Sequence, residues 1–361
     1  MVLLTAKELQ EKEFVSNILI MSKVVYLLGA GASRGTRDEK KGIVTGLPIV
    51  KEIKDELQNM TNLLASIPLN DKELEESKQT LIRGFQQLKV ACSDNATIDT
   101  YAKKLWLQGK KGEFAQVELL LTIFFILEQV IHKPDNRYDS FFANILLREI
   151  ECSNELTLPD NIRILSWNYD NQLELVYRGY YETKYSRLRD ILGIYDVKSK
   201  ENEKSLRKNS SVIKLNGTAN FVDEEDWLQF SDANKITETL LSNLLNKYAE
   251  CLQVGRCDGQ LRLNFAWEEA YSKDLLENVM PQMVQEATAL VVIGYSFPYF
   301  NRKIDRLVIE NMPHLKKIYI QDKFPERIEQ YITPVIPEDR LAGIKIVRLD
   351  DVEQFYLPPE L

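Results

Sequence analysis

Short runs of apolar and mostly β-branched residues recur along the chain at wide intervals, each bounded by polar residues or glycine. Runs of this length predict buried strands. The longer segments between them carry apolar residues at helical spacing, and strands that alternate with helices are typical of a parallel sheet covered on both faces. The pattern therefore predicts an α/β fold with strands at residues 24–28, 162–165, 212–215, 290–293, 318–320 and 344–347.

Two of the connecting segments are too long to be simple crossovers between strands. Residues from about 52 to 158 and from about 227 to 285 both show the apolar periodicity of helices. We expect each to be a large helical insertion into a single domain that spans residues 23–361. Residues 1–22 form an amphipathic stretch, which predicts an N-terminal helical arm used in packing or assembly.

The composition narrows the class of protein. Of the 361 residues, 44% are hydrophobic, which is enough for a large core. Basic and acidic residues are interleaved, and the net charge of -8 argues against a broad nucleic-acid surface. The four cysteines match no zinc-ribbon spacing and follow no recognisable signal peptide, so we expect a cytoplasmic protein without a structural metal.

Two further patterns argue against common classes. The longest apolar run, residues 117–131, is interrupted by Glu118 and Glu128, so no membrane-spanning segment is expected. The chain has two histidines, His132 and His314, which makes hydrolysis by a Ser-His-Asp or Cys-His arrangement a poor hypothesis. His132 stands near the end of a predicted helix, where a role as a charge partner is favoured over catalysis.

The first predicted strand runs directly into the sequence Gly29-Ala30-Gly31-Ala32-Ser33. The two glycines permit close approach of the backbone, so successive N–H groups of this turn could face an anionic pyrophosphate. The dinucleotide-binding pattern GxGxxG is only half met, because Arg34 occupies the third glycine position. A glycine turn of purely structural meaning is an equal alternative.

Three later strands also end in small or amide residues. Asn168 and Asp170 follow one predicted strand, Asn216-Gly217 follows the next, and a Gly-Tyr-Ser sequence at 294–296 follows a third. Taken singly, each is compatible with an ordinary turn. Because the carboxyl ends of parallel strands share one edge of the sheet, together they predict a single polar crevice that binds a ligand.

This set of segments resembles the sirtuin family, and specifically the sirtuin-like domains of bacterial anti-phage effectors that consume NAD. The resemblance extends from Val24 to Asp322 and includes Ile98-Asp99. It implies a sirtuin-like form of the Rossmann-like parallel sheet, with the helical insertions added to it. The matching segments are Gly29-Ala30-Gly31-Ala32-Ser33, Gly46-Leu47-Pro48, Asn168-Tyr169-Asp170, Lys214-Leu215-Asn216-Gly217 and Gly294-Tyr295-Ser296-Phe297-Pro298.

The resemblance also implies where NAD would lie. Its pyrophosphate would contact residues 29–33, and Asn168 and Asp170 would face the nicotinamide ribose. Catalysis would involve Asn168, Asp170 and Asn216, with Asn168 holding water beneath the ribose. Gly294 and Ser296 would bind the adenosine half. The remaining positions expected to contact NAD are Pro48, Gly217 and, near the adenosine ribose, Asp322.

The chain departs from the sirtuin pattern in two places. The zinc-ribbon cysteines of deacylating sirtuins are absent. Asn216-Gly217 stands where the family usually has His-Gly, and an amide cannot accept a proton as a general base does. Two explanations of Asn216 remain open: a naturally divergent, slower enzyme, or a deliberate His-to-Asn change.

The function expected from this resemblance is hydrolysis of NAD to nicotinamide and ADP-ribose by an effector of a bacterial anti-phage defence system. NAD is the substrate, and no metal is expected. We expect a homo-oligomer that responds to self-assembly or to a HerA-type ATPase or Argonaute-like partner, without direct contact with nucleic acid or membranes. A catalytically silent subunit that binds NAD or ADP-ribose is the alternative, and an NAD-dependent protein deacylase is the third hypothesis.

Overall fold

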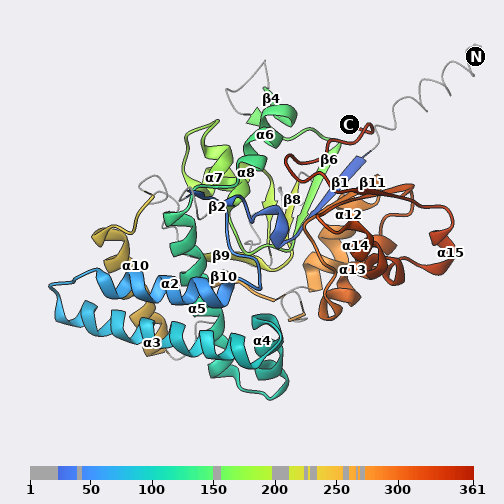
Figure 1. Ribbon diagram of the computed structural model, residues 1–361. Helices are drawn as coiled ribbons and strands as arrows, with labels where there is room; N and C mark the ends of the chain where they lie inside the picture. Colours follow the sequence, from blue (N-terminus) through green and yellow to red (C-terminus); the bar gives the residue numbers. More distant parts are fainter. Residues whose placement is uncertain are drawn as a thin grey trace, which may run out of the picture.

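The computed structural model describes residues 23–38, 43–148, 156–196, 211–222, 227, 234–254, 260–265, 267–268 and 273–361. Within these residues, seven parallel strands form one sheet in the order β13, β12, β11, β1, β6, β8, β7 (Figure 1). The arm predicted for residues 1–22 lies outside the described residues. The strands are β1 (Lys23–Leu28), β6 (Ile162–Ser166), β7 (Ile194–Tyr195), β8 (Val212–Lys214), β11 (Ala287–Ile293), β12 (Lys317–Gln321) and β13 (Lys345–Leu349).

The predicted α/β fold with a Rossmann-like parallel sheet is confirmed. All six strands predicted from the apolar runs belong to this sheet. The seventh strand, β7, was not predicted, because two residues are too few to give a recognisable apolar pattern. It adds an edge to the sheet by pairing with β8.

Each face of the sheet packs against its own core, and side chains alternate between the two faces along each strand. Val25 and Leu27 face one core, whereas Val24, Tyr26 and Leu28 face the other. Figure 1 shows helices on either side of the sheet. The first core is completed by the π-helical turn Leu275–Val279, α12 (Met280–Val284), α13 (Arg302–Glu310) and α14 (Pro325–Ile332), and the second by α6 (Asn136–Ile145), α7 (Gln172–Arg178) and α8 (Tyr185–Ile191).

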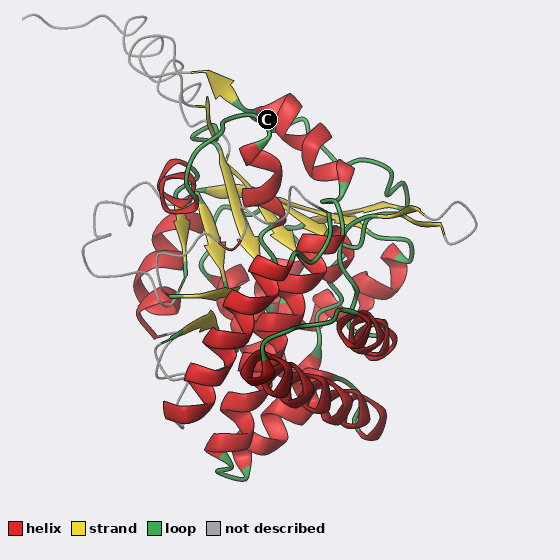
Figure 2. Cartoon of the chain, turned by 90° about the vertical axis from the view of Figure 1, so that its left-hand side faces the viewer, coloured by secondary structure: helices red, strands yellow, loops and turns green. Residues whose placement is uncertain are grey.

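A third core belongs to the segments inserted between the strands. Helices from both insertions share this core, and we call the assembly the helical unit. Figures 1 and 2 show it stacked beyond one end of the sheet strands. The helical unit consists of α2 (Ile53–Ser66), α3 (Lys72–Asp94), α4 (Ile98–Leu107), α5 (Lys111–Ile131), α10 (Glu238–Val254) and the antiparallel strands β9 (Gly217–Phe221) and β10 (Leu261–Leu263).

Helix α5 lies at the centre of the helical unit. By length and composition alone, α5 is the one helix in the described part of the chain that could cross a membrane. Nearly all of its residues from Phe114 to Val130 are buried by the surrounding protein, as in the core helix of a soluble protein. The remaining short elements are β2 (Arg37–Asp38), β3 (Ile43–Val44), β4 (Leu147–Arg148), β5 (Leu156–Thr157), α15 (Glu338–Leu341) and the 3-10 turns Ala30–Ala32, Tyr299–Asn301 and Thr333–Val335.

Candidate functional site

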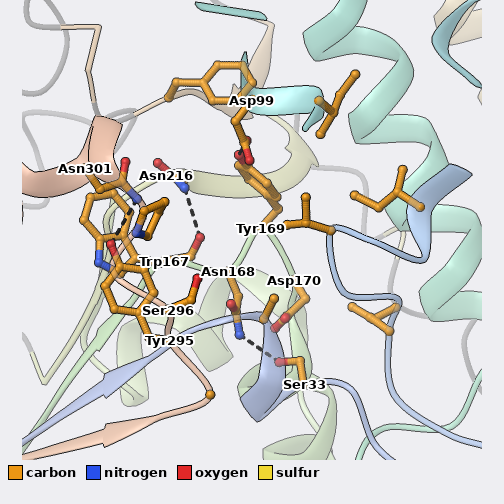
Figure 3. Close-up of a pocket in the computed structure, with 18 of the residues that line it drawn as sticks. Ser33, Asp99, Trp167, Asn168, Tyr169, Asp170, Asn216, Tyr295, Ser296 and Asn301 are labelled. Atoms are coloured by element: carbon orange, nitrogen blue, oxygen red, sulfur yellow. Dashed lines mark hydrogen bonds between the residues drawn. The ribbon is translucent and has the colours of Figure 1, made fainter. Parts of the chain in front are cut away.

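A pocket lies at the carboxyl edge of the sheet, beside the central strand β1. This strand pairs with β6 on one side and with β11 on the other, so the chain connections diverge at this point. Open α/β sheets bind ligands in the crevice at such a switch point. The segments that follow β1, β6, β8 and β11 all line the pocket, and the helical unit closes it (Figure 3).

The turns that follow β1 and β11 pack backbone against backbone. A Cβ atom on Gly31 would lie 2.8 Å from the Gly294 Cα, which is too close for any side chain. Gly294 itself has a φ of +59°, and its Cβ position lies 2.4 Å from the Ala32 nitrogen. The Gly29 N–H donates to the Ile293 carbonyl at 3.0 Å, and the Gly31 N–H donates to the Gly294 carbonyl at 2.9 Å. The glycines therefore allow the two turns to touch.

These contacts correct the expectation that successive N–H groups of residues 29–33 face a ligand. The Ala32 N–H donates to the Gly29 carbonyl at 2.8 Å, and the Ser33 N–H donates to the Ala30 carbonyl at 3.2 Å. Of the five N–H groups, that of Ala30 alone donates to no group in the described part of the chain. Ala30 and Ser33 are also the residues of this turn that line the pocket.

Ser33 and Asn168 fasten the first two turns to each other. The Asn168 Nδ2 donates to the Ser33 Oγ at 2.9 Å and to the Gly29 carbonyl at 3.0 Å (Figure 3). The Ser33 hydroxyl is also 2.9 Å from the Tyr138 hydroxyl. Within the described residues the Asn168 Oδ1 accepts no hydrogen bond. It is therefore the atom of this side chain that a ligand in the pocket can bind. Asn168 therefore supports the fold as well as lining the site.

Asp170 lies beside a buried ion pair. Burial raises the pKa of Asp170, while the charge of Lys214 and a hydrogen bond from Ser33 lower it. The Lys214 Nζ donates to the Asp170 carbonyl at 2.7 Å and lies 3.2 Å from the Glu174 Oε2. The side chains of Lys214 and Glu174 are both fully buried. The Asp170 Oδ1 also accepts the Gln172 N–H at 3.1 Å, so this carboxylate is held by its neighbours.

Asn216 reaches the pocket from the end of β8. Its Nδ2 donates to the Trp167 carbonyl at 3.0 Å, which joins the segments after β6 and β8. Gly217 follows with a φ of +64°, and a Cβ atom there would lie 2.0 Å from the Arg262 carbonyl oxygen. Gly217 therefore makes the tight entry into β9 and is not a lining residue of the pocket.

The pocket gathers most of the predicted residues but not all. Gly29, Gly31, Ala32 and Asp322 are not lining residues, and Asp322 follows β12, the next strand beyond β11. The Asp322 Oδ1 accepts the Phe324 N–H at 2.9 Å, which is a turn-forming contact. The predicted residues that line the pocket are Ala30, Ser33, Pro48, Asn168, Asp170, Asn216, Gly294 and Ser296.

Aromatic side chains form much of the wall, and none of them was among the site residues predicted from the sequence. Trp167 stacks on Tyr295 with ring centroids 5.6 Å apart, and Phe265 stacks on Trp267 at 4.9 Å. Phe265 and Trp267 come from the second insertion, whose position over the crevice depends on long-range packing that no local pattern encodes. The aromatic lining residues are Phe125, Trp167, Tyr169, Phe265, Trp267, Tyr295 and Phe300.

The charged side chains of the pocket are acidic. Asp99 and Asp170 line it, and the lining residues include no lysine, arginine or histidine among those the structure describes. The Tyr169 hydroxyl donates to the Asp99 Oδ1 at 2.7 Å (Figure 3). Burial raises the pKa of Asp99. An aromatic pocket with carboxylates and without basic lining side chains favours a ligand that carries positive charge.

No protein-family model matches the chain, and no curated protein matches it. The resemblance to sirtuin-like domains therefore depends on the residues and on the pocket that they line.

Proposed function

We propose that the chain hydrolyses NAD to nicotinamide and ADP-ribose. The observation that carries this proposal is the meeting of four strand ends in one pocket, where Ser33, Asn168, Asn216 and Ser296 are all lining residues. These residues come from four of the five segments in which the sequence resembles sirtuin-like domains that consume NAD. The pocket also lies at the switch point of the sheet, where α/β folds bind nucleotides.

The chemistry of the pocket supports cleavage of the N-glycosidic bond. As nicotinamide leaves with the bonding electron pair, positive charge develops on the ribose, and water then adds to that carbon and releases a proton. The carboxylates of Asp99 and Asp170 favour positive charge inside a partly buried site. The Asn168 Oδ1 can accept a hydrogen bond from the water or from a ribose hydroxyl.

The pyrophosphate would rely on neutral donors, because no basic side chain is among the described lining residues. Ala30 offers its backbone N–H and Ser296 offers its hydroxyl group, whereas the Ser33 hydroxyl is already hydrogen-bonded to Asp170 and Asn168. This assignment keeps the phosphates near the turns after β1 and β11 and the positively charged nicotinamide near Asp99, at the opposite end of the pocket. The reverse placement would put the phosphates beside the Asp99 carboxylate, which has no cationic partner among the described residues and would repel them.

A silent NAD- or ADP-ribose-binding subunit is the second candidate. The position of Asn216 favours it, because the Asn216 amide cannot remove a proton and its Nδ2 donates to the Trp167 carbonyl. The deacylase hypothesis is weaker, since the zinc-ribbon cysteines are absent from the sequence. Anti-phage defence, a cytoplasmic location, self-assembly and a HerA-type or Argonaute-like partner remain predictions that follow from the resemblance.

Replacing Asn216 with histidine separates hydrolase from silent subunit. We expect Asn216→His to raise nicotinamide release from NAD by roughly 10²- to 10⁴-fold, because the imidazole supplies the missing proton acceptor. The assay compares both proteins at equal folded concentration, with NAD binding measured in parallel. Asn216→Gln is the matched control, since it changes the size of the side chain without adding a base. NAD binding without any gain in the histidine variant would favour the silent subunit, whereas absence of NAD binding would overturn both.

A further inference from the structure

Asp99 is held in the pocket wall by the structure around it. It lies in the first turn of α4, which begins after the N-cap residue Thr97. Its side chain is buried, and the Tyr169 hydroxyl fixes one carboxylate oxygen at 2.7 Å. Figure 3 shows Asp99 and Tyr169 side by side, away from Ser33 and Asp170. The helical unit thus delivers one carboxylate to the end of the pocket opposite the β1 turn.

The two pocket carboxylates have different surroundings. Asp170 lies near the Lys214 ammonium and accepts hydrogen bonds from Ser33 and the Gln172 N–H. Asp99 forms no ion pair within the described residues, and its hydrogen-bonding partner Tyr169 is a neutral hydroxyl. Burial of a carboxylate without a cation is costly. A cationic ligand would remove that cost at Asp99. At Asp170 the Lys214 charge already compensates part of the cost, so a cationic ligand would add less.

Other groups around Asp99 do not supply the missing cation. Glu118 and Glu268 act on the neighbouring Tyr169 as negative charges, and Cys92 on α3 is a thiol whose pKa rises to about 11, chiefly through burial. Lys103, one turn along α4, lies over the Trp267 ring at 4.2 Å from its centroid. The surroundings of Asp99 are therefore mainly acidic and aromatic, with the nearby Lys103 ammonium placed over the Trp267 ring.

The rings beside Asp99 are suited to a flat ligand. Tyr169 packs edge-on against Phe265, with centroids 6.0 Å apart, and Phe265 stacks on Trp267. All three line the pocket together with Asp99. Aromatic faces attract cations through their quadrupoles, and a carboxylate nearby adds a direct charge interaction.

We propose that Asp99 is a specificity-determining residue, positioned by Tyr169, that selects ligands carrying a positively charged aromatic ring over otherwise identical neutral ones. With NAD as the ligand, the selected form is the oxidised, pyridinium form, and NADH is disfavoured because its dihydropyridine ring is neutral. This assignment of the ring rests on the proposed function. Selection between cationic and neutral rings does not require that NAD be hydrolysed.

The test uses two small probes that need only this part of the pocket. The probes are 1-methylnicotinamide, a permanent pyridinium cation, and nicotinamide, its neutral counterpart. Binding to the full chain is followed by quenching of tryptophan fluorescence, since Trp167 and Trp267 line the pocket. We expect the wild type to bind the cation at least about tenfold more tightly than the neutral probe.

Three variants locate the effect. Asp99→Asn should bring the ratio of the two affinities close to one while leaving nicotinamide binding unchanged, because the amide keeps the shape and loses the charge. Tyr169→Phe should lower the ratio without abolishing it, since the carboxylate loses its orienting hydroxyl. Asp94→Asn, at the exposed end of α3, is the matched control for a change of one charge and should leave the ratio unchanged. Thermal melting checks that each variant folds.

The outcomes separate this inference from the proposed function. An Asp99→Asn protein that keeps the wild-type preference would overturn the inference, as would a wild type that binds both probes equally or neither. NAD and NADH are then titrated into the same proteins, and nicotinamide release is measured independently. A chain that discriminates between the probes yet releases no nicotinamide, even with Asn216→His, retains the inference and loses the hydrolase proposal. A chain that releases nicotinamide from NAD but binds the two probes equally retains the hydrolase proposal and loses the inference.

Discussion

Single glycines determine whether the pocket can form. Gly294 adopts a φ of +59° directly after β11, and its missing side chain leaves room for the β1 turn. The sequence allowed two interpretations of Gly29 and Gly31, a phosphate-binding turn or a purely structural one. The structure shows that glycine is required here because the backbones of two turns are in contact. Sequence alone could not decide between these meanings, because the partner turn lies more than 250 residues away in the chain.

Gly294→Ala should destabilise the fold as well as the site. The new methyl group would meet the Ala32 nitrogen at 2.4 Å in a left-handed backbone conformation, which we expect to cost at least about 1–3 kcal/mol of the free energy of unfolding. Urea denaturation measures the loss. Gly112→Ala is the control, since a Cβ there meets nothing within 4 Å and lies in the first turn of α5. Equal stability of the two variants would contradict the packing argument.

At the scale of elements, α7 and β8 are joined by charge inside the protein. Lys214 on β8 and Glu174 on α7 are fully buried, and the lysine also donates to the Asp170 carbonyl. A buried pair adds little stability over an apolar pair, but removal of one partner leaves the other charge without compensation. The pair therefore fixes how the segment after β6 lies against β8.

Removal of Lys214 tests that connection. We expect Lys214→Met to lower the free energy of unfolding by about 3–5 kcal/mol, because Glu174 is left buried without its cation. The double variant Lys214→Met/Glu174→Gln should recover a substantial part of the loss, as measured by urea denaturation. Should the single variant unfold within about 1 kcal/mol of the parent, the pair would not have the predicted role.

Whether a feature of the fold or the site can be predicted from the sequence depends on whether it is determined locally. The strand at Ile162–Ser166 and the Asn168-Tyr169-Asp170 segment after it follow from a short apolar run and its polar end, and the sheet edge brings that segment into the crevice. Phe265 and Trp267 could not be predicted, because their place in the wall results from packing between two separate insertions. Asn216 was identified from the motif, but its bond to Trp167 required the structure.

At the scale of the whole molecule, an unpaired carboxyl in the core of the helical unit makes stability depend on pH. Glu128 on α5 is fully buried, and neither of its carboxyl oxygens has a hydrogen-bond partner within the described residues. The Nε2 atom of His132, at the end of α5, lies 3.6 Å from the Glu128 Oε2, but burial lowers the pKa of His132 and favours the neutral ring. This location agrees with a charge-partner role for His132 only when the ring is protonated. Burial is also the main reason that the pKa of Glu128 rises to about 8, with Glu56 raising it further and Arg37 lowering it.

The direction of the pH effect follows from proton binding. An unfolded glutamate has a pKa near 4.5, so between about pH 4.5 and 8 the folded protein binds more protons than the unfolded chain. The free energy of unfolding should therefore fall as the pH rises through this window, by up to a few kcal/mol from this group. Glu128→Gln removes the ionisation, so its stability relative to the wild type should increase between pH 5 and pH 8. Glu113→Gln, a partly exposed position on the same helix, is the control and should show no such trend in urea denaturation at the two pH values. If Glu128→Gln followed the wild type at both, Glu128 would not be the group responsible.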